Sequence, residues 1–240
     1  SVTVKATPTI NNKTIALNPP AGVCAGETLQ IGSGASASAG TSAYKWIYAT
    51  SQANVTGKTF LDVPSGDGIH TGTTGNVLSL ATTSANRTVL NTRFYGLTIS
   101  ATDNGCTVRD TTTFIQPIIN PLPDTAHFVT SIEADAVTET GSGKKVTIYA
   151  CNGTSIPLKV NTNDALQNGT LKHTDYTYTW RNGSTVLTSG VTNNGNKGTQ
   201  YVIPAASASG NQTIYCQVSA KAKLDDGTEV CDRFVVATFN

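Results

Sequence analysis

The feature that most constrains this chain is a pattern of cysteine, tyrosine and tryptophan residues that occurs twice. The two copies are Cys24, Tyr44-Lys45-Trp46 and Cys106, followed by Cys151, Tyr178-Thr179-Trp180 and Cys231. Corresponding residues lie 127 (24 to 151), 134 (46 to 180) and 125 (106 to 231) positions apart. Spacings that differ by only a few residues indicate a tandem repeat whose loops have diverged in length.

Each copy predicts a β-sandwich of immunoglobulin type, in which a tryptophan lies on a central strand between two distant cysteines. Short alternating runs such as Thr28-Leu29-Gln30-Ile31 are typical of half-buried strands. Turn sequences such as Asp103-Asn104-Gly105 are typical of hairpins, because Asn and Gly tolerate positive φ. The expected fold class is therefore all-β, with two tandem immunoglobulin-like β-sandwich domains and one intradomain disulfide in each.

The boundary between the two domains is marked by proline. The segment from Pro117 to Asp124 has three prolines within seven residues, which stiffens a linker toward an extended conformation. A chain of 240 residues also has room for two domains of ordinary size. We therefore predict one domain over residues 1–119 and a second over residues 120–240.

The five cysteines predict disulfides rather than a metal site, because no C-x-x-C pair is present and no histidine lies near them. The expected bridges are Cys24–Cys106 and Cys151–Cys231. Disulfides indicate an oxidising compartment.

The fifth cysteine, Cys216, is expected to be a buried thiol. Aligning Ile99-Ser100-Ala101 with Val218-Ser219-Ala220 places Cys216 opposite Leu97, a core position. The alternative pairing Cys151–Cys216 would imitate the antibody bridge across two central strands. The first copy has no cysteine at the Cys216 position, which favours Cys231 as the partner of Cys151. Trp46 and Trp180 are expected in the two cores rather than as exposed platforms for sugars.

Composition excludes several functions. Charged residues make up 13% of the chain, against about 25% in ordinary soluble proteins. The net charge is +1 and the cations are scattered, so we expect no nucleic-acid partner. No run approaches the roughly 20 apolar residues of a membrane span. Strand-like residues at both ends suggest a piece of a longer polypeptide.

No catalytic or metal site is expected. The three histidines (His70, His127 and His173) lie in separate turn-like segments and are expected to be exposed loop residues. No G-x-S-x-G sequence marks a nucleophile. The run Thr140 to Lys145 lacks the residues of a phosphate loop and is expected to be a turn. Cofactors are expected to be absent, with interdomain calcium at Glu133, Asp135 and Glu139 as the alternative, although three carboxylates supply few of the oxygens that calcium needs.

The repeated residues also carry a family resemblance. The chain resembles the immunoglobulin-like repeats of large surface and gliding-motility adhesins of Bacteroidetes-type bacteria. The matching residues are Cys24-x-Gly26, Leu29, Tyr44-x-Trp46, Tyr95 and Gly105-Cys106, then Cys151-x-Gly153, Leu158, Tyr178-x-Trp180, Tyr215 and Cys231, with Val230 in place of the last glycine. The resemblance implies an extracellular, cell-surface location. It also draws attention to two tripeptides that such bacteria O-glycosylate, Asp110-Thr111-Thr112 and Asp124-Thr125-Ala126, although sequences this short also arise by chance.

The expected function is that of a structural or adhesive repeat module in a secreted or cell-surface bacterial protein, an adhesin or stalk, and not an enzyme. Its partners would be neighbouring repeats of the same polypeptide, with a glycan or another surface ligand on loops such as 32–40 and 64–75. The chain itself is expected to be a monomer. The alternative is an accessory module of a secreted polysaccharide-degrading enzyme that binds glycan through Tyr48 or Tyr201. A third hypothesis is a pilin subunit with Lys–Asn isopeptide bonds. The intact mass of the protein would distinguish it, because an isopeptide bond and a disulfide remove different masses.

Overall fold

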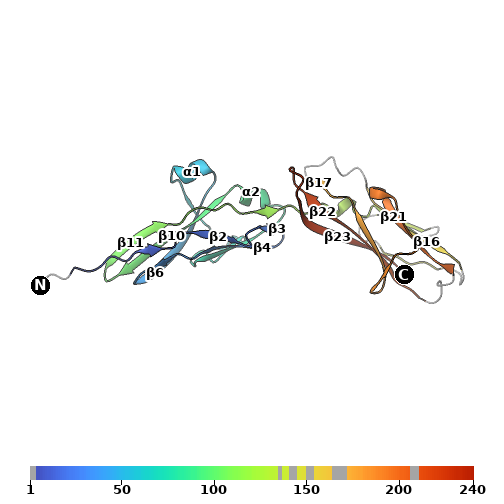
Figure 1. Cartoon of the computed structure of the whole chain (residues 1–240), viewed down its shortest axis with the longest axis horizontal. Helices are drawn as coiled ribbons and strands as arrows, with labels where there is room; N and C mark the ends of the chain where they lie inside the picture. Colours follow the sequence, from blue (N-terminus) through green and yellow to red (C-terminus); the bar gives the residue numbers. More distant parts are fainter. Residues whose placement is uncertain (1–3, 135–136, 141–144, 150–153, 164–171, 206–210) are drawn as a thin grey trace. The chain divides into compact units, whose positions relative to one another are not determined.

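The computed structural model of the chain contains two β-sandwiches (Figure 1). Trp46 and Trp180 each lie on a central strand of one of them. The structure describes residues 4–134, 137–140, 145–149, 154–163, 172–205 and 211–240. The chain divides into a first domain, Ser1–Pro121, and a second domain, Leu122–Asn240. The division falls two residues later than residue 119, because Ile119–Asn120 pairs with a strand of the first domain.

The first domain has two main sheets of four strands. One sheet has the order β2 (Ile15–Asn18), β4 (Thr28–Ser33), β9 (Val77–Ala81) and β8 (His70–Thr71). The other has the order β11 (Cys106–Thr111), β10 (Phe94–Asp103), β6 (Thr41–Ala49) and β7 (Leu61–Asp62). Two short pairs complete the domain: β1 (Ile10–Asn11) with β5 (Ser36–Ala37), and β3 (Val23–Cys24) with β12 (Ile119–Asn120).

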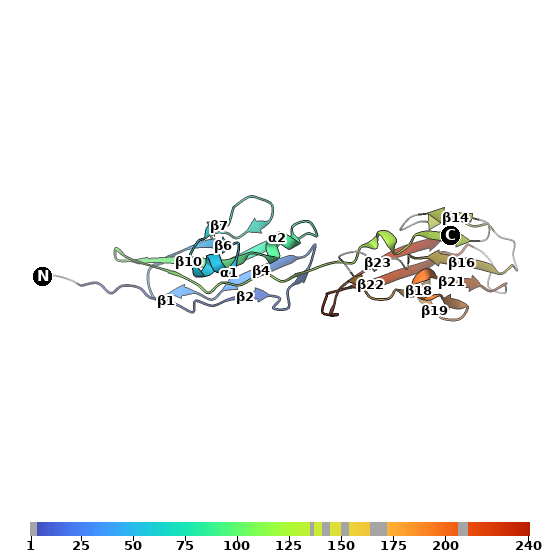
Figure 2. The ribbon, with the colours of Figure 1, turned by 90° about the horizontal axis from the view of Figure 1, so that it is seen from above.

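The second domain repeats this plan with longer sheets. One sheet has the order β14 (Val137–Thr140), β13 (Ser131–Ala134), β16 (Ile156–Asn161), β21 (Gly198–Ile203) and β20 (Val191–Asn193). The other has the order β15 (Lys145–Val146), β23 (Glu229–Phe239), β22 (Ile214–Lys223), β18 (Thr177–Asn182) and β19 (Thr185–Leu187), and β17 (Lys172–His173) also pairs with β22. Figure 2 shows β18 and β19 in this domain from above.

The connectivity of both domains is that of the immunoglobulin fold. Eight strands of each domain are lettered A, B, C, C′, D, E, F and G in chain order. They are β2, β4, β6, β7, β8, β9, β10 and β11 in the first domain and β13, β16, β18, β19, β20, β21, β22 and β23 in the second. With these letters one sheet of each domain reads A-B-E-D and the other G-F-C-C′. Sheets with these orders, packed face to face, define the immunoglobulin sandwich. The predicted all-β fold with two tandem immunoglobulin-like sandwiches is confirmed, but the prediction of one disulfide within each domain is not. The duplicated tryptophan lies on strand C in each domain, at the position that the fold reserves for its buried tryptophan.

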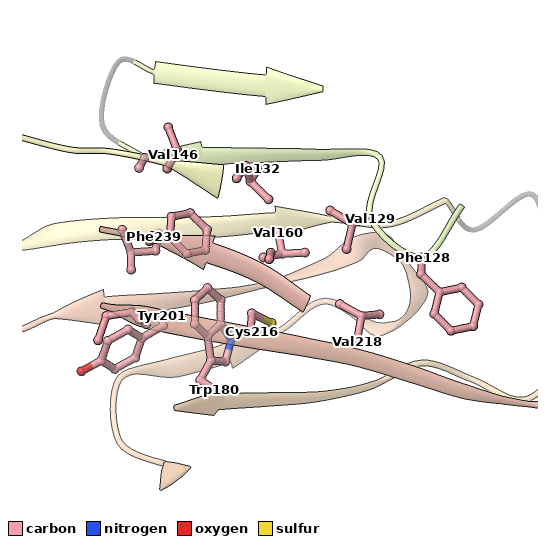
Figure 3. Packing of buried hydrophobic residues seen from close by; sticks show 14 of the residues in the cluster. Phe128, Val129, Ile132, Val146, Val160, Trp180, Tyr201, Cys216, Val218 and Phe239 are labelled. Atoms are coloured by element: carbon pink, nitrogen blue, oxygen red, sulfur yellow. The ribbon is translucent and has the colours of Figure 1, made fainter. Parts of the chain in front are cut away.

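Both cores are built from alternating apolar residues on facing strands. In strand F of the first domain, Tyr95, Leu97 and Ile99 have no exposed surface, as the alternating sequence predicts. Trp46 and Trp180 are each 1% exposed. In Figure 3 the Trp180 ring lies beside Cys216 and Tyr201 in the interior of the second domain. The two tryptophans are therefore core residues, as expected.

Each buried indole also makes a hydrogen bond near the start of strand E. Trp46 Nε1 donates to the Gly75 carbonyl oxygen at 2.9 Å, and Trp180 Nε1 donates to Thr199 Oγ1 at 3.0 Å. An indole N–H left unpaired in a core would cost free energy. The same polar requirement is thus met at the same place in both domains.

The strand register confirms the alignment of the two repeats. Trp46 pairs with Leu97 across strands C and F, and Trp180 pairs with Cys216. Cys216 is free and has no exposed surface, as expected. Burial raises the pKa of its thiol, so the sulfur is held in the unreactive protonated form.

Short helices that the periodicity did not predict occupy loops of both domains. α1 (Gln52–Thr56) begins where Ser51 Oγ accepts a hydrogen bond from the backbone N–H of Asn54, and α2 is Arg87–Asn91. The second domain has the 3-10 turns η1 (Thr125–His127) and η3 (Gly195–Lys197). Runs of five residues or fewer are too short to show a helical period, which is why sequence pattern misses them.

We predict that the two roles of Trp46 can be separated by mutation. Trp46→Ala should lower the stability of the first domain by about 3–5 kcal/mol through the cavity it leaves. Trp46→Phe should cost about 1–3 kcal/mol, because the Gly75 carbonyl loses its donor. Urea unfolding followed by backbone NMR signals of the first domain measures both. Val89→Ala, at a residue of the same domain that is 52% exposed, is the control and should change stability by no more than about 0.5 kcal/mol. A Trp46→Phe variant as stable as the wild type would contradict the role given to the hydrogen bond.

Candidate functional site

The cysteine sites differ from the predicted pattern in the first domain. Cys24 and Cys231 are disulfide-bonded, whereas Cys106 and Cys216 are free. The expected Cys24–Cys106 bridge is therefore wrong. Cys106 pairs with Asp103 at the hairpin end of β10, while Cys24 pairs with Asn120, in the chain beyond the opposite end of β10. A disulfide needs Cα atoms within about 7 Å, and ten strand residues span far more.

Only one of the two cysteines of the second predicted bridge lies in the described part of the chain. Cys231 is disulfide-bonded, but Cys151, its predicted partner, lies outside the described residues. The alternative pairing Cys151–Cys216 is wrong, because Cys216 is free. The chain has five cysteines, of which Cys106 and Cys216 are free and Cys24 and Cys231 are both bonded. A Cys151–Cys231 bridge would leave no cysteine for Cys24 to bond with, so that predicted bridge is wrong as well.

Thiol labelling tests this assignment. Under native conditions iodoacetamide should label Cys106, which is partly exposed, and leave Cys216 unmodified until the protein is unfolded. Non-reducing peptide mapping should then recover Cys24 and Cys231 in disulfide-linked peptides and identify the partner of each. A peptide joining Cys24 to Cys106 would contradict the structure.

Two of the three histidines are buried, contrary to the expectation of exposed loop residues. His70 is 2% exposed and His173 is 7% exposed, and the His127 side chain lies outside the described part of the chain. The expectation failed because turn-rich sequence around a histidine does not report whether the loop folds back over the core.

His70 is the centre of a polar chain across the first domain. Asp67 Oδ2 lies 2.6 Å from His70 Nδ1, and the Tyr95 hydroxyl lies 3.0 Å from His70 Nε2. A proton on Nδ1 lets the imidazole donate to the carboxylate and accept from the phenol. Tyr95 has no exposed surface, and burial raises its pKa to about 12. Solvent does not reach this phenol, so a substrate cannot reach it either. The hydrogen-bonded chain Asp67–His70–Tyr95 therefore has a structural role and connects the loop 64–75 to strand F.

Asp67 makes this connection dependent on pH. Burial alone would raise the pKa of its carboxyl, but backbone N–H groups of His70 and Ile69 and the imidazole lower it from 3.8 to about 2. A carboxyl whose pKa is lower in the folded state contributes stability above its unfolded pKa and loses that contribution as the pH falls toward the folded value.

We therefore predict that Asp67→Asn destabilises the first domain at neutral pH and that the difference from the wild type shrinks between about pH 4 and about pH 2. Urea unfolding at several pH values measures the difference. Asp62→Asn, which removes an exposed ion pair with Lys45, is the matched control and should show a smaller effect. A difference between Asp67→Asn and wild type that stays constant down to pH 2 would overturn the prediction.

Of the three carboxylates in the alternative calcium hypothesis, only Glu133 has a side chain among the described residues. Glu133 accepts a hydrogen bond from Asn161 Nδ2 at 2.6 Å and lies 3.6 Å from Lys159 Nζ. Asp135 and the Glu139 side chain lie outside the described residues. Within the described ranges no three His, Cys, Asp or Glu residues are placed to hold a metal ion.

The two tripeptides of the glycosylation hypothesis have structural contacts. The side chain of Asp124 accepts a hydrogen bond from the backbone N–H of Ala126 and caps η1. Thr112 is 4% exposed, and its hydroxyl accepts from the Leu97 N–H and donates to the Thr113 carbonyl. These contacts give Asp124 and Thr112 structural roles.

The aromatic residues proposed for glycan binding fall in different environments. Tyr201 is 7% exposed, and its ring centroid lies 5.7 Å from that of Trp180, so it is a core residue and that hypothesis is wrong for Tyr201. Tyr48 is half-buried, and the Arg93 guanidinium lies 4.4 Å from its ring centroid. That contact covers one face of the ring.

An open pocket of about 310 Å³ lies elsewhere in the second domain. It is formed by the segment leading into strand C, Asp175 to Tyr178, and by the turn between strands D and E, which contains Asn193, Gly195 and Asn196. This volume lies at the lower end of the range for small-molecule sites. Sequence reasoning assigned Tyr178 only to the Tyr-x-Trp strand. The run Asn193-Asn194-Gly195-Asn196 was the available signal for a polar turn.

The pocket is held together by its own hydrogen bonds. The Tyr178 hydroxyl donates to the Gly195 carbonyl at 2.7 Å, and Asn196 Nδ2 donates to Asp175 Oδ1 at 2.7 Å. Asn196 Oδ1 accepts from the Tyr176 backbone N–H at 2.9 Å. The turn and the strand are thus fixed to one another before any ligand arrives.

Comparison with known proteins finds only distant structural similarities. No family model and no curated protein matches the chain. Similar solved structures include the insect immune protein hemolin (15% identity, 91% of this chain and 44% of that chain, TM-score 0.30) and the four N-terminal immunoglobulin domains of Dscam1 (9%, 94% and 46%, TM-score 0.29). A titin segment gives 14% identity over 99% of this chain and 66% of its own, with a TM-score of 0.31. The chain thus spans less than half the length of the hemolin and Dscam1 structures.

These similarities are too weak to assign a family or a function. The assignment of the immunoglobulin fold therefore rests on the strand order of the two domains alone.

None of the helices in the described ranges has the length and apolar character needed to cross a lipid bilayer.

Proposed function

We propose that this chain is a structural and adhesive module of a secreted or cell-surface bacterial protein, an adhesin or stalk. The observation that carries the proposal is the duplicated sandwich. Each domain has its own A-B-E-D and G-F-C-C′ sheets and its own tryptophan bonded to strand E or the turn before it. Domains that each bury a complete core can be joined in series without depending on one another for folding.

Surface chemistry and cysteine chemistry support an extracellular location. Only 13% of the residues are charged, and threonine, serine and asparagine supply most of the polar surface. Cys24 and Cys231 are disulfide-bonded, which suits an oxidising compartment. In this proposal the chain is a monomer whose neighbours are further immunoglobulin-like repeats of the same polypeptide.

The parent polypeptide separates this proposal from an accessory module of a polysaccharide-degrading enzyme. Further copies of the cysteine–tryptophan repeat on either side favour an adhesin or stalk, whereas an adjoining catalytic domain favours the enzyme. Both alternatives place the chain outside the cell.

Antibody labelling and deletion test the proposal directly. Antibodies raised against the folded chain should label intact cells of the source bacterium, and deletion of the coding segment should reduce attachment of those cells to surfaces. Expression of the segment in the deleted strain should restore attachment. Labelling that requires permeabilised cells, or attachment unchanged by the deletion, would contradict the proposal.

A further inference from the structure

The pocket beside Tyr178 lies at the edge of the core of the second domain, where Tyr178 packs against the buried Tyr176. We propose that it binds a neutral saccharide. The proposal rests on the proposed function, because an extracellular adhesive module meets glycans, and it names the class of ligand that this module would hold.

The pocket combines an aromatic wall with polar side chains, which is the chemistry that a sugar needs. Tyr178, which is half-buried, supplies that wall, whereas Tyr176 is 7% exposed and packs in the core behind it, with the two ring centroids 6.3 Å apart. Aromatic rings with a polar end suit ligands that are apolar on one side and wet on the other. A pyranose ring is such a ligand, because its C–H faces are apolar and its hydroxyl groups lie at its edge.

The polar residues offer both kinds of hydrogen-bonding group. Asp175 is exposed, and one of its carboxylate oxygens accepts from Asn196, which leaves capacity to accept from sugar hydroxyls. Asn193 is also exposed, and its Oδ1 accepts from Thr199 Oγ1 at 2.7 Å, which orients its amide group. A hydroxyl group both donates and accepts, so it can pair with either residue.

Charge selects among saccharides. Of the described residues that line the pocket, Asp175 alone carries a charge, and that charge is negative. Like charges in contact oppose binding, so phosphates, uronic acids and sialic acids are disfavoured. A neutral mono- or disaccharide fits the chemistry best.

Rigidity makes a small site effective. Thr162 Oγ1 donates to the Asn196 carbonyl at 2.5 Å, in addition to the bonds from Tyr178 and Asn196 described above. Ordering of loops and side chains is one of the costs of binding, and a site that is already ordered avoids it. The D–E turn and strand C therefore present the polar groups in one arrangement.

The test is an NMR titration of the complete chain with a panel of disaccharides. The neutral probes are cellobiose, maltose, lactose and chitobiose, and the acidic probes are sialyllactose and digalacturonic acid. At least one neutral probe should shift the amide signals of Tyr178 and Asn196 with millimolar affinity, and the acidic probes should bind more weakly. Asp175→Asn should weaken binding of that neutral probe about tenfold, because a hydrogen bond to a charged group is lost.

Asp225→Asn is the matched control, because it removes the same charge from an exposed turn of the same domain. It should leave affinity unchanged. The proposal is overturned if no neutral probe shifts these signals, if an acidic probe binds more tightly, or if Asp175→Asn binds as Asp225→Asn does. Surface labelling of cells without saccharide binding would refute only this inference, whereas saccharide binding without surface labelling would refute the proposed function.

Discussion

The buried tryptophan of strand C is the interaction on which each domain depends. Its ring lies between the two sheets, and its indole N–H is bonded near the start of strand E in the opposite sheet, to Gly75 in the first domain and to Thr199 in the second. The ring contributes apolar burial, and the N–H makes the packing directional, because only one orientation satisfies it. The rest of the two sandwiches is arranged around this contact.

The core beside this tryptophan in the second domain is held by packing. In many immunoglobulin domains a disulfide from strand F lies against the strand C tryptophan. Here Cys216 occupies that place on strand F as a free, buried thiol, and the Trp180 ring lies 5.7 Å from those of Tyr201 and Phe239. Aromatic contacts of this kind contribute beyond their buried area. The cysteine at this position acts as a small apolar side chain.

Polar groups at the ends of the strands have different consequences in the two domains. In the first, Asp67, His70 and Tyr95 form a chain that ties a loop to the core, and its His70 and Tyr95 members are buried. In the second, Asp175, Tyr178 and Asn196 form bonded groups that line an open pocket. Similar residue types therefore give a tether in one place and a proposed ligand site in the other, and exposure to solvent makes the difference.

The sequence by itself determined the fold class, the duplication, the burial of Trp46 and Trp180 and the free thiol of Cys216. These follow from local alternation and from spacing, which persist whatever the loops do. Only the tertiary structure decided that Cys106 is free, that His70 is buried and that Asp175, Asn193 and Asn196 share a pocket. Those features depend on which strand ends and loops meet in space, and residues far apart in the chain carry no local pattern that reports such meetings.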